Sequence, residues 1–358
     1  MKPIILIAFA AFFHSISWAQ TPGNIESVEY DSSANRWFIS NNNSILVTSD
    51  VGDSYEYFGN AIATHGMEAI DGHLFAIGNN VIRAYDLNTA ELVGSLSISG
   101  AGFLNGMGSR SGELIVSDFS TGKLHRIDTS DPTAMSSEVL VAATGTTPNG
   151  VTIDEANNRA LVVNWGNNAS IISVDLETGE FSFIVPITGV GNLEVIYMDG
   201  QVRFYVSSWS PARITRYTND FSSSETVVQG ASSGLANPAD ISYSLQNDTL
   251  GVANSGNGTP SFHDFGSSND LSEIDPKPEN AHWEANAIHL LSPMPGVWNL
   301  TIWNTAGQLK DERSIDLSAG NASISMEQLG WEPLHSDLIQ ILSPLGRPFV
   351  LRPGQHRP

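Results

Sequence analysis

The segment Pro148-Asn149-Gly150-Val151-Thr152-Ile153-Asp154 is followed by the apolar run Leu161-Val162-Val163-Asn164 and then by Ser170-Ile171-Ile172-Ser173-Val174-Asp175. Polar turns separate these three segments, which are rich in β-branched residues. This order predicts consecutive strands of one antiparallel sheet. Similar units occur before and after it. The segment is therefore one copy of a repeat, and the repeat predicts the fold.

The repeat is clearest in six short apolar strands, at residues 37–40, 74–77, 114–117, 161–164, 204–207 and 250–253. Their first residues lie 37 to 47 positions apart. A period of about 40–45 residues with several short strands is the size of a propeller blade. We therefore predict an all-β protein with a six-bladed β-propeller at residues 20–265. A meandering β-sandwich would explain the alternation within strands but not six returns of one unit.

Composition excludes several classes of protein. The chain has 358 residues, with 38 Asp and Glu against 16 Lys and Arg, a formal net charge of −22. Such a charge repels phosphate backbones, so we expect no nucleic-acid partner. The chain has no cysteine, which excludes disulfides, thiolate zinc sites and thiol nucleophiles.

The N-terminus predicts export. Lys2 precedes an apolar run at residues 4–13, and Ser17-Trp18-Ala19 places small residues where a signal peptidase cleaves. We predict a signal peptide at residues 1–19, cleaved after Ala19, and a secreted or cell-surface protein. The apolar run is about half of the roughly 20 residues that a membrane span needs. No later stretch is long enough either, so no transmembrane segment is expected.

The repeat pattern stops after residue 265. Residues 266–282 are rich in Ser, Asp, Glu and Pro and predict a linker. Alternating apolar residues then return at 298–304, 322–326 and 338–342. They predict a small C-terminal β-sandwich at residues 283–358.

The repeats resemble the senescence-marker-protein/gluconolactonase (regucalcin-like) family of six-bladed propellers. The similarity lies in the Pro148–Asp154 blade entry, in Ile25-Glu26-Ser27-Val28-Glu29-Tyr30-Asp31 at the opening blade, and in Asn237-Pro238-Ala239-Asp240-Ile241 at the last. The resemblance implies a divalent metal, calcium or zinc, in the central channel, where it polarises a lactone carbonyl.

The same resemblance implies site residues. Glu26 and Asn149 match metal ligands, and Asn105 matches a polar position near metal and substrate. The aspartate that the family uses as ligand and base is replaced by Leu193, so the catalytic residue stays unknown. Glu194 or Asn192 could substitute by a slip of one residue, but a slip reverses the face to which a strand residue points.

Other residues near blade entries add candidates and alternatives. Glu68 and Asp240 could add charge to the channel as substrate-binding residues. Glu26 could equally be an exposed carboxylate, and Asn149 a turn residue. Trp165 and Trp209 follow equivalent strands and either stack on a ligand at the channel mouth or pack between blades.

Two functional hypotheses are open, and a third, a purely structural surface protein, is also compatible with the sequence. One is a metal-dependent hydrolase of lactones or related esters. The other is a non-catalytic exported propeller that binds a small molecule, a glycan or a protein, and the loss of the aspartate at Leu193 favours it.

The C-terminal unit resembles a type IX secretion sorting domain of the Bacteroidetes kind. The similar pieces are Leu300-Thr301-Ile302-Trp303-Asn304-Thr305-Ala306-Gly307-Gln308 and Ile339-Gln340-Ile341. The resemblance implies that the secretion machinery is a partner of this domain. The usual opening Pro-Asn-Pro is absent, which leaves an accessory sandwich as the alternative.

Overall fold

The computed structural model describes residues 20–49, 54–199, 202–265, 281–284, 287–290, 296–303, 309–317, 322–330, 338–342 and 348–351. The chain divides into two compact units, Met1–Gly266 and Ser267–Pro358. The predicted signal peptide at 1–19 lies outside the described residues, as does the predicted linker from 266 to 280. Ala281 and His282 belong to a strand, so placing them in the linker was wrong.

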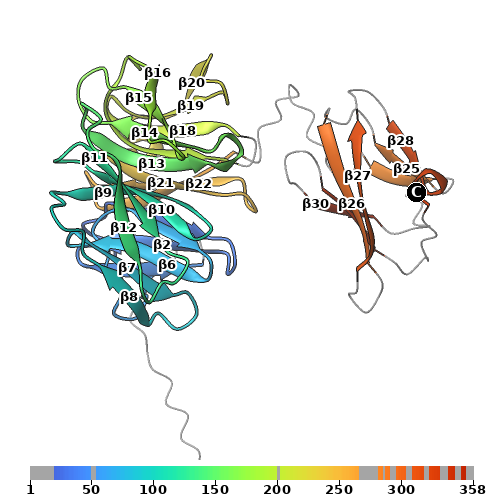
Figure 1. The fold of residues 1–358 in the computed structure, drawn as a ribbon, viewed down its shortest axis with the longest axis horizontal. Helices are drawn as coiled ribbons and strands as arrows, with labels where there is room; N and C mark the ends of the chain where they lie inside the picture. Colours follow the sequence, from blue (N-terminus) through green and yellow to red (C-terminus); the bar gives the residue numbers. More distant parts are fainter. Residues whose placement is uncertain are drawn as a thin grey trace, which may run out of the picture. The chain divides into compact units, whose positions relative to one another are not determined.

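The first unit consists of six antiparallel sheets in chain order, and the prediction of a six-bladed β-propeller is confirmed (Figure 1). Blade 1 contains β1 (Val28–Asp31), β2 (Arg36–Asn41), β3 (Ser44–Thr48) and β4 (Glu56–Tyr57). Blade 2 contains β5 (Met67–Ile70), β6 (His73–Gly78), β7 (Val81–Asp86) and β8 (Leu92–Leu96). Blade 3 contains β9 (Leu104–Arg110), β10 (Glu113–Asp118), β11 (Lys123–Asp128) and β12 (Ser136–Val141).

The other three blades repeat this order. Blade 4 contains β13 (Pro148–Asp154), β14 (Arg159–Asn164), β15 (Ile171–Asp175) and β16 (Phe181–Val185). Blade 5 contains β17 (Gly191–Met198), β18 (Phe204–Ser210), β19 (Ala212–Tyr217) and β20 (Ser224–Gln229). Blade 6 contains β21 (Pro238–Ser244), β22 (Thr249–Asn254) and β23 (Thr259–Asp264). Short 3-10 turns occur at Glu155–Asn157 and Ala231–Ser233.

Each of the six strands expected from the repeat is the second strand of a blade, from β2 to β22. These strands are buried on both faces because their side chains alternate between two neighbouring blades. In β2, Phe38 packs with Leu74 of blade 2, whereas Ile39 packs with Ala253 of blade 6. Six such clusters, one at each blade interface, form the core of the propeller.

The ring closes between blades 6 and 1. The Asp240 backbone N–H donates to the Glu26 carbonyl at 3.1 Å, and the Ser27 hydroxyl donates to Asp240 Oδ2 at 2.6 Å. The innermost strands β1, β5, β9, β13, β17 and β21 contact one another in sequence around the ring. Figure 1 shows β21 returning beside the first, blue blade.

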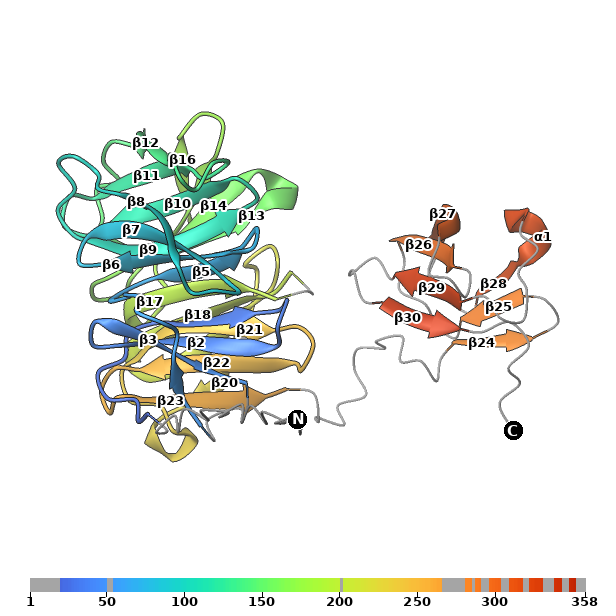
Figure 2. The same ribbon diagram turned by 90° about the horizontal axis from the view of Figure 1, so that it is seen from below.

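The second unit contains two small sheets, which are also visible in Figure 2. One has β24 (Ala281–Glu284), β25 (Ala287–Leu290) and β28 (Ala322–Ser325). The other has β26 (Gly296–Trp303), β27 (Leu309–Leu317), β29 (Leu338–Leu342) and β30 (Pro348–Leu351). A one-turn helix, α1, covers Met326–Leu329. Ile288 and Ile324 of one sheet share a buried core with Trp298 and Ile339 of the other, which makes the unit a small sandwich.

Within the described ranges, no helix is both long and apolar enough to span a bilayer.

Candidate functional site

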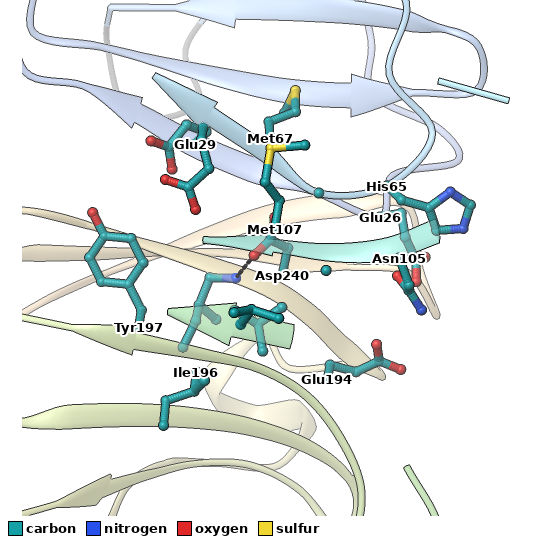
Figure 3. Close-up of a pocket in the computed structure, with 16 residues that line it drawn as sticks. Glu26, Glu29, His65, Met67, Asn105, Met107, Glu194, Ile196, Tyr197 and Asp240 are labelled. Carbon is teal, nitrogen blue, oxygen red and sulfur yellow. Dashed lines mark hydrogen bonds between the residues drawn. The ribbon is translucent and has the colours of Figure 1, made fainter. Parts of the chain in front are cut away.

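The innermost strands surround a small cavity at the propeller axis (Figure 3). Its volume is about 20 Å³, which is little more than the 10–15 Å³ that one water molecule needs. Five of the six residues predicted from the sequence line it, namely Glu26, Glu68, Asn105, Glu194 and Asp240. The sixth, Asn149, lies directly behind this lining. The structure therefore brings the sequence candidates together at one place.

A β-bulge near the start of four of the six inner strands, β9, β13, β17 and β21, decides which of their side chains enter the channel. In β13 the register with β14 shifts between Pro148 and Val151, and in β17 it shifts with β18 between Leu193 and Ile196. β9 and β21 carry the same shift. A bulge places an extra residue on one strand and redirects side chains. When β9, β13 and β17 are aligned on their bulges, Glu194 of β17 lies at the position that Asn105 has in β9 and Asn149 has in β13.

This alignment corrects the sequence interpretation of blade 5. Leu193 is buried in the cluster between blades 4 and 5 and matches Pro148, so it does not occupy a channel position. Glu194 needs no slip to reach the channel, because the bulge is common to the equivalent strands. In regular strand pairing, a shift of one residue turns a side chain to the opposite face of the sheet. This rule does not apply at a β-bulge, which contains an extra residue. Blade 5 thus supplies a carboxylate to the axis.

Asn149 supports Glu194 from behind. Asn149 is 1% exposed, and its amide Nδ2 donates to Glu194 Oε2 at 2.9 Å and to the Leu193 carbonyl at 3.0 Å. Two acceptors on one side fix the orientation of the amide. In this arrangement Asn149 positions Glu194, and its assignment as a direct metal ligand stays a prediction.

Glu26 and Glu194 share one end of the cavity with His65 and Asn105 (Figure 3). Burial raises the pKa of Glu26 to about 7. Burial also raises the pKa of Glu194, and the nearby Glu26 raises it further. Burial lowers the pKa of His65 to about 4, so this imidazole is neutral at pH 7 and adds no positive charge. We call this end, defined by Glu26, His65, Asn105 and Glu194, the channel mouth.

Figure 3 shows Glu29 and Tyr197 at the other end of the cavity. Glu68 also lines the cavity and interacts electrostatically with both, so Glu29 and Glu68 form a second carboxylate pair. The Ser109 hydroxyl donates to Glu68 Oε2 at 2.7 Å, and the Ala69 backbone N–H donates to Glu29 Oε1 at 3.1 Å. Burial raises the pKa of Glu29 to about 8, and the pKa of Glu68 is raised by burial and by Glu29. Asp240, whose pKa burial raises to about 7, interacts electrostatically with both ends.

Sequence reasoning missed Glu29, Tyr197 and His65. Tyr197 and Ser242 each follow the residue that comes directly after the bulge. Glu29 and Glu68 lie at the matching positions of β1 and β5, and strand alternation turns all four side chains to the channel. An alignment of the six blades on that core residue would have found Glu29 and Tyr197. His65 was missed because the spacing of the histidines gives no metal-ligand pattern.

The carboxylates and the Asn105 amide offer oxygen ligands to the channel, and the other lining side chains with potential ligand atoms include His65 and the thioethers of Met67 and Met107. The oxygen set suits calcium better than zinc. Within the part of the chain that the structure describes, no three His, Asp or Glu side chains stand at positions that could hold a metal ion. An ion at the channel mouth would therefore combine two carboxylates, Glu26 and Glu194, with the Asn105 amide oxygen and water.

No protein-family model and no curated protein matches the chain. Solved structures do. A structural-genomics protein of unknown function from Bacteroides thetaiotaomicron aligns with a TM-score of 0.57 and 10% identity, over 69% of this chain and 71% of that one. A chain of a nidogen/laminin complex aligns with a TM-score of 0.50 and 12% identity, over 63% and 92%. Streptogramin B lyase aligns with a TM-score of 0.47 and 13% identity, over 69% of this chain and 96% of that one. At these identities the first two support the propeller fold alone.

Proposed function

We propose that this protein is a ligand-binding β-propeller whose axial channel takes up a cation. One observation carries the proposal: five carboxylates converge on the cavity, and none of the residues lining it is Lys or Arg. Burial raises the pKa of these groups because it penalises their charged forms. A bound cation offsets that penalty by pairing with the charged carboxylates.

Calcium is the inorganic cation that fits best. Hard divalent cations prefer carboxylate, amide and water oxygens, which Glu26, Glu194 and Asn105 supply at the channel mouth. Asn149 keeps Glu194 in place through its amide hydrogen bond. Bound calcium would supply Lewis acidity to a carbonyl group at the mouth.

Hydrolysis of lactones or esters is the second candidate. The resemblance to gluconolactonase-type propellers suggests it, and the position of Glu194 at the channel mouth favours it. A cavity of about 20 Å³ cannot enclose a sugar lactone, because small-molecule pockets usually have 300–1,000 Å³. A substrate would have to sit outside the mouth, so binding is the function that the geometry supports best.

Titration calorimetry with calcium chloride tests the proposal. We expect saturable uptake by the parent protein at about pH 8, a weaker affinity in Glu194→Gln and Glu26→Gln, and a smaller loss in Asn149→Ala. Glu177→Gln is the matched control, since Glu177 is exposed and lies in a turn of blade 4. Absence of calcium uptake by the parent would exclude calcium, and equal affinity in all variants would place the ion elsewhere. Turnover of aldonolactones that Glu194→Gln removes would favour the hydrolase.

Export remains part of the proposal, with the C-terminal sandwich acting as a sorting domain for type IX secretion. The support is the signal-peptide pattern at residues 1–19 and the strand pattern of the second unit. N-terminal sequencing of protein recovered outside the cells tests it, with Gln20 expected first. Retention inside cells would contradict export, and unchanged export after deletion of residues 283–358 would contradict the sorting role.

A further inference from the structure

Five aromatic rings form an unbroken arc that starts at the channel mouth. His65 and Phe103 have ring centroids 4.7 Å apart, and Phe103 and Phe119 are 5.8 Å apart. The arc continues from Phe119 to Trp165 at 6.1 Å and from Trp165 to Trp209 at 5.0 Å. Each ring meets the next edge to face, and His65 also lines the axial cavity. We call this set the aromatic arc.

The arc follows the face of the propeller on which the inner strands begin. Phe119, Trp165 and Trp209 occupy the same position in blades 3, 4 and 5. They directly follow Asp118, Asn164 and Ser208, which pair with Leu104, Pro148 and Leu193. Phe103 precedes β9 directly. The arc therefore extends from the mouth across successive blades on one half of the ring.

The propeller fold does not require aromatic residues at this position. The register of blades 1, 2 and 6 puts Asn42, Asn79 and Ser255 at the equivalent places. Phe103 is 36% exposed, and Phe119, Trp165 and Trp209 are only partly buried. Packing between blades, one of the two roles expected for Trp165 and Trp209, thus accounts for part of each ring. The remaining ring surface is available to a ligand.

The electrostatics of this face select a positively charged ligand. Aromatic faces attract cations through their quadrupole, and the mouth beside them has Glu26 and Glu194 without a lining Lys or Arg. The cavity of about 20 Å³ accepts a group the size of water, such as a lysine ammonium, and is too small for a sugar ring. Charge and size together favour an amine on a flexible stem.

The length of the arc selects an extended ligand. A small amine reaches one or two rings, whereas the arc has five rings spaced 4.7 to 6.1 Å apart. Alternate side chains of an extended polypeptide point to one side about 6.6–7 Å apart, which is comparable to this spacing. We propose that the mouth and the aromatic arc together dock an extended, lysine-containing segment of a partner protein, with one lysine ammonium in the channel and neighbouring side chains on the rings.

This inference rests on the proposed uptake of a cation by the channel, and one set of variants separates the two. The probe is a short synthetic peptide of alternating lysine and glycine, titrated against the full chain by calorimetry and by tryptophan fluorescence. Trp165→Ala should weaken peptide binding about fivefold, the range of one cation–π contact, and should leave calcium uptake unchanged. Glu194→Gln should weaken both.

Matched controls exclude unspecific attraction to the net charge of −22. Phe183→Ala removes a ring that is 47% exposed on β16, outside the arc, and should leave peptide affinity unchanged. Trp165→Phe keeps a ring and should restore most of the affinity. The same peptide with acetylated lysines should not bind.

Three outcomes would overturn the docking proposal. One is equal peptide affinity in the parent and Trp165→Ala, with calcium uptake retained, which leaves the proposed function standing. Another is an equal loss of peptide affinity in the Trp165→Ala and Phe183→Ala variants. The third is binding of an uncharged oligosaccharide that depends on Trp165 while the lysine peptide fails to bind, which would assign the arc to glycans. If neither calcium nor the peptide responds to Glu194→Gln, the proposed function fails as well.

Discussion

Glu29 shows how a single buried carboxylate couples this fold to pH. Its side chain is 5% exposed and accepts a hydrogen bond from the Ala69 backbone. Burial nevertheless raises its pKa to about 8, from an ordinary value of 4.5. The folded state therefore binds the proton more tightly than the unfolded chain does, and Glu29 contributes stability that is present at low pH and lost as pH rises.

We predict that Glu29→Gln gains stability relative to the parent protein as pH rises from about 5 to 8. Glutamine does not titrate. Over this window the unfolded parent chain releases the Glu29 proton, whereas the folded channel retains it up to its pKa of about 8, so the parent loses stability as pH rises. Thermal unfolding of both proteins at each pH measures the effect, and their difference cancels the titration of the histidines. Glu177→Gln should follow the parent at every pH. A constant difference between Glu29→Gln and the parent would show that folding does not raise the pKa of Glu29.

At the scale of the strand, glycine permits the inner strands to approach one another at the bulge. A Cβ on Gly106 would lie 2.3 Å from the Asn149 carbonyl oxygen, and one on Gly150 would lie 2.4 Å from the Val195 Cα. Both neighbours are backbone atoms of the next blade, so they cannot move without displacing a strand. The narrow channel is a consequence of these close approaches.

We predict that Gly106→Ala destabilises the propeller by about 1–3 kcal/mol, the usual cost of overpacking. The added methyl group must push β9 away from β13, which also moves Asn149 and loosens Glu194. Denaturant unfolding measures the stability, and calcium affinity should fall with it. Gly23→Ala is the control, since its Cβ would meet only an ordinary contact of 3.7 Å. A loss in Gly23→Ala equal to that in Gly106→Ala would refute the steric explanation.

The carboxylates at the C-terminal ends of the inner strands β1 and β13 have a structural role, unlike those in the channel. Asp154 ends β13 and contacts Arg159 at 2.8 Å, and Asp31 and Arg36 form the same pair in blade 1 at 2.8 Å. Both carboxylates hold the hairpin between the first two strands and lie outside the residues that line the cavity.

For the whole molecule, two separate cores imply two folding units. The propeller core consists of six clusters between blades, and the sandwich has its own cluster around Trp298, which is fully buried. Units with separate cores generally unfold independently.

We predict that calorimetry shows two unfolding transitions and that Trp298→Ala lowers only one of them. Removing a buried tryptophan lowers the free energy of unfolding by about 3–5 kcal/mol. This is a large loss for a small sandwich, so its unfolding transition should move to a lower temperature. Calcium should raise the midpoint of the other transition, because the ion binds only the folded propeller. A single transition that shifts in both experiments would mean that the units unfold together.

The sequence alone was sufficient for the blade count and the strands. Apolar segments 37 to 47 residues apart can bury both faces only against neighbours like themselves, so stacking around an axis follows from the repeat. Local patterns also located Glu26, Glu68, Asn105 and Asp240 near strand starts. None of this requires knowing which residues meet across the ring.

Only the tertiary structure decided the orientation of side chains at the axis. The bulge that excludes Leu193 and admits Glu194 depends on pairing between β17 and β18, which no local pattern in one strand encodes. The aromatic arc likewise links residues from four blades, which become neighbours only when the ring closes. The reason is physical: periodicity sets which strands form, whereas register and closure set which distant side chains share one cavity.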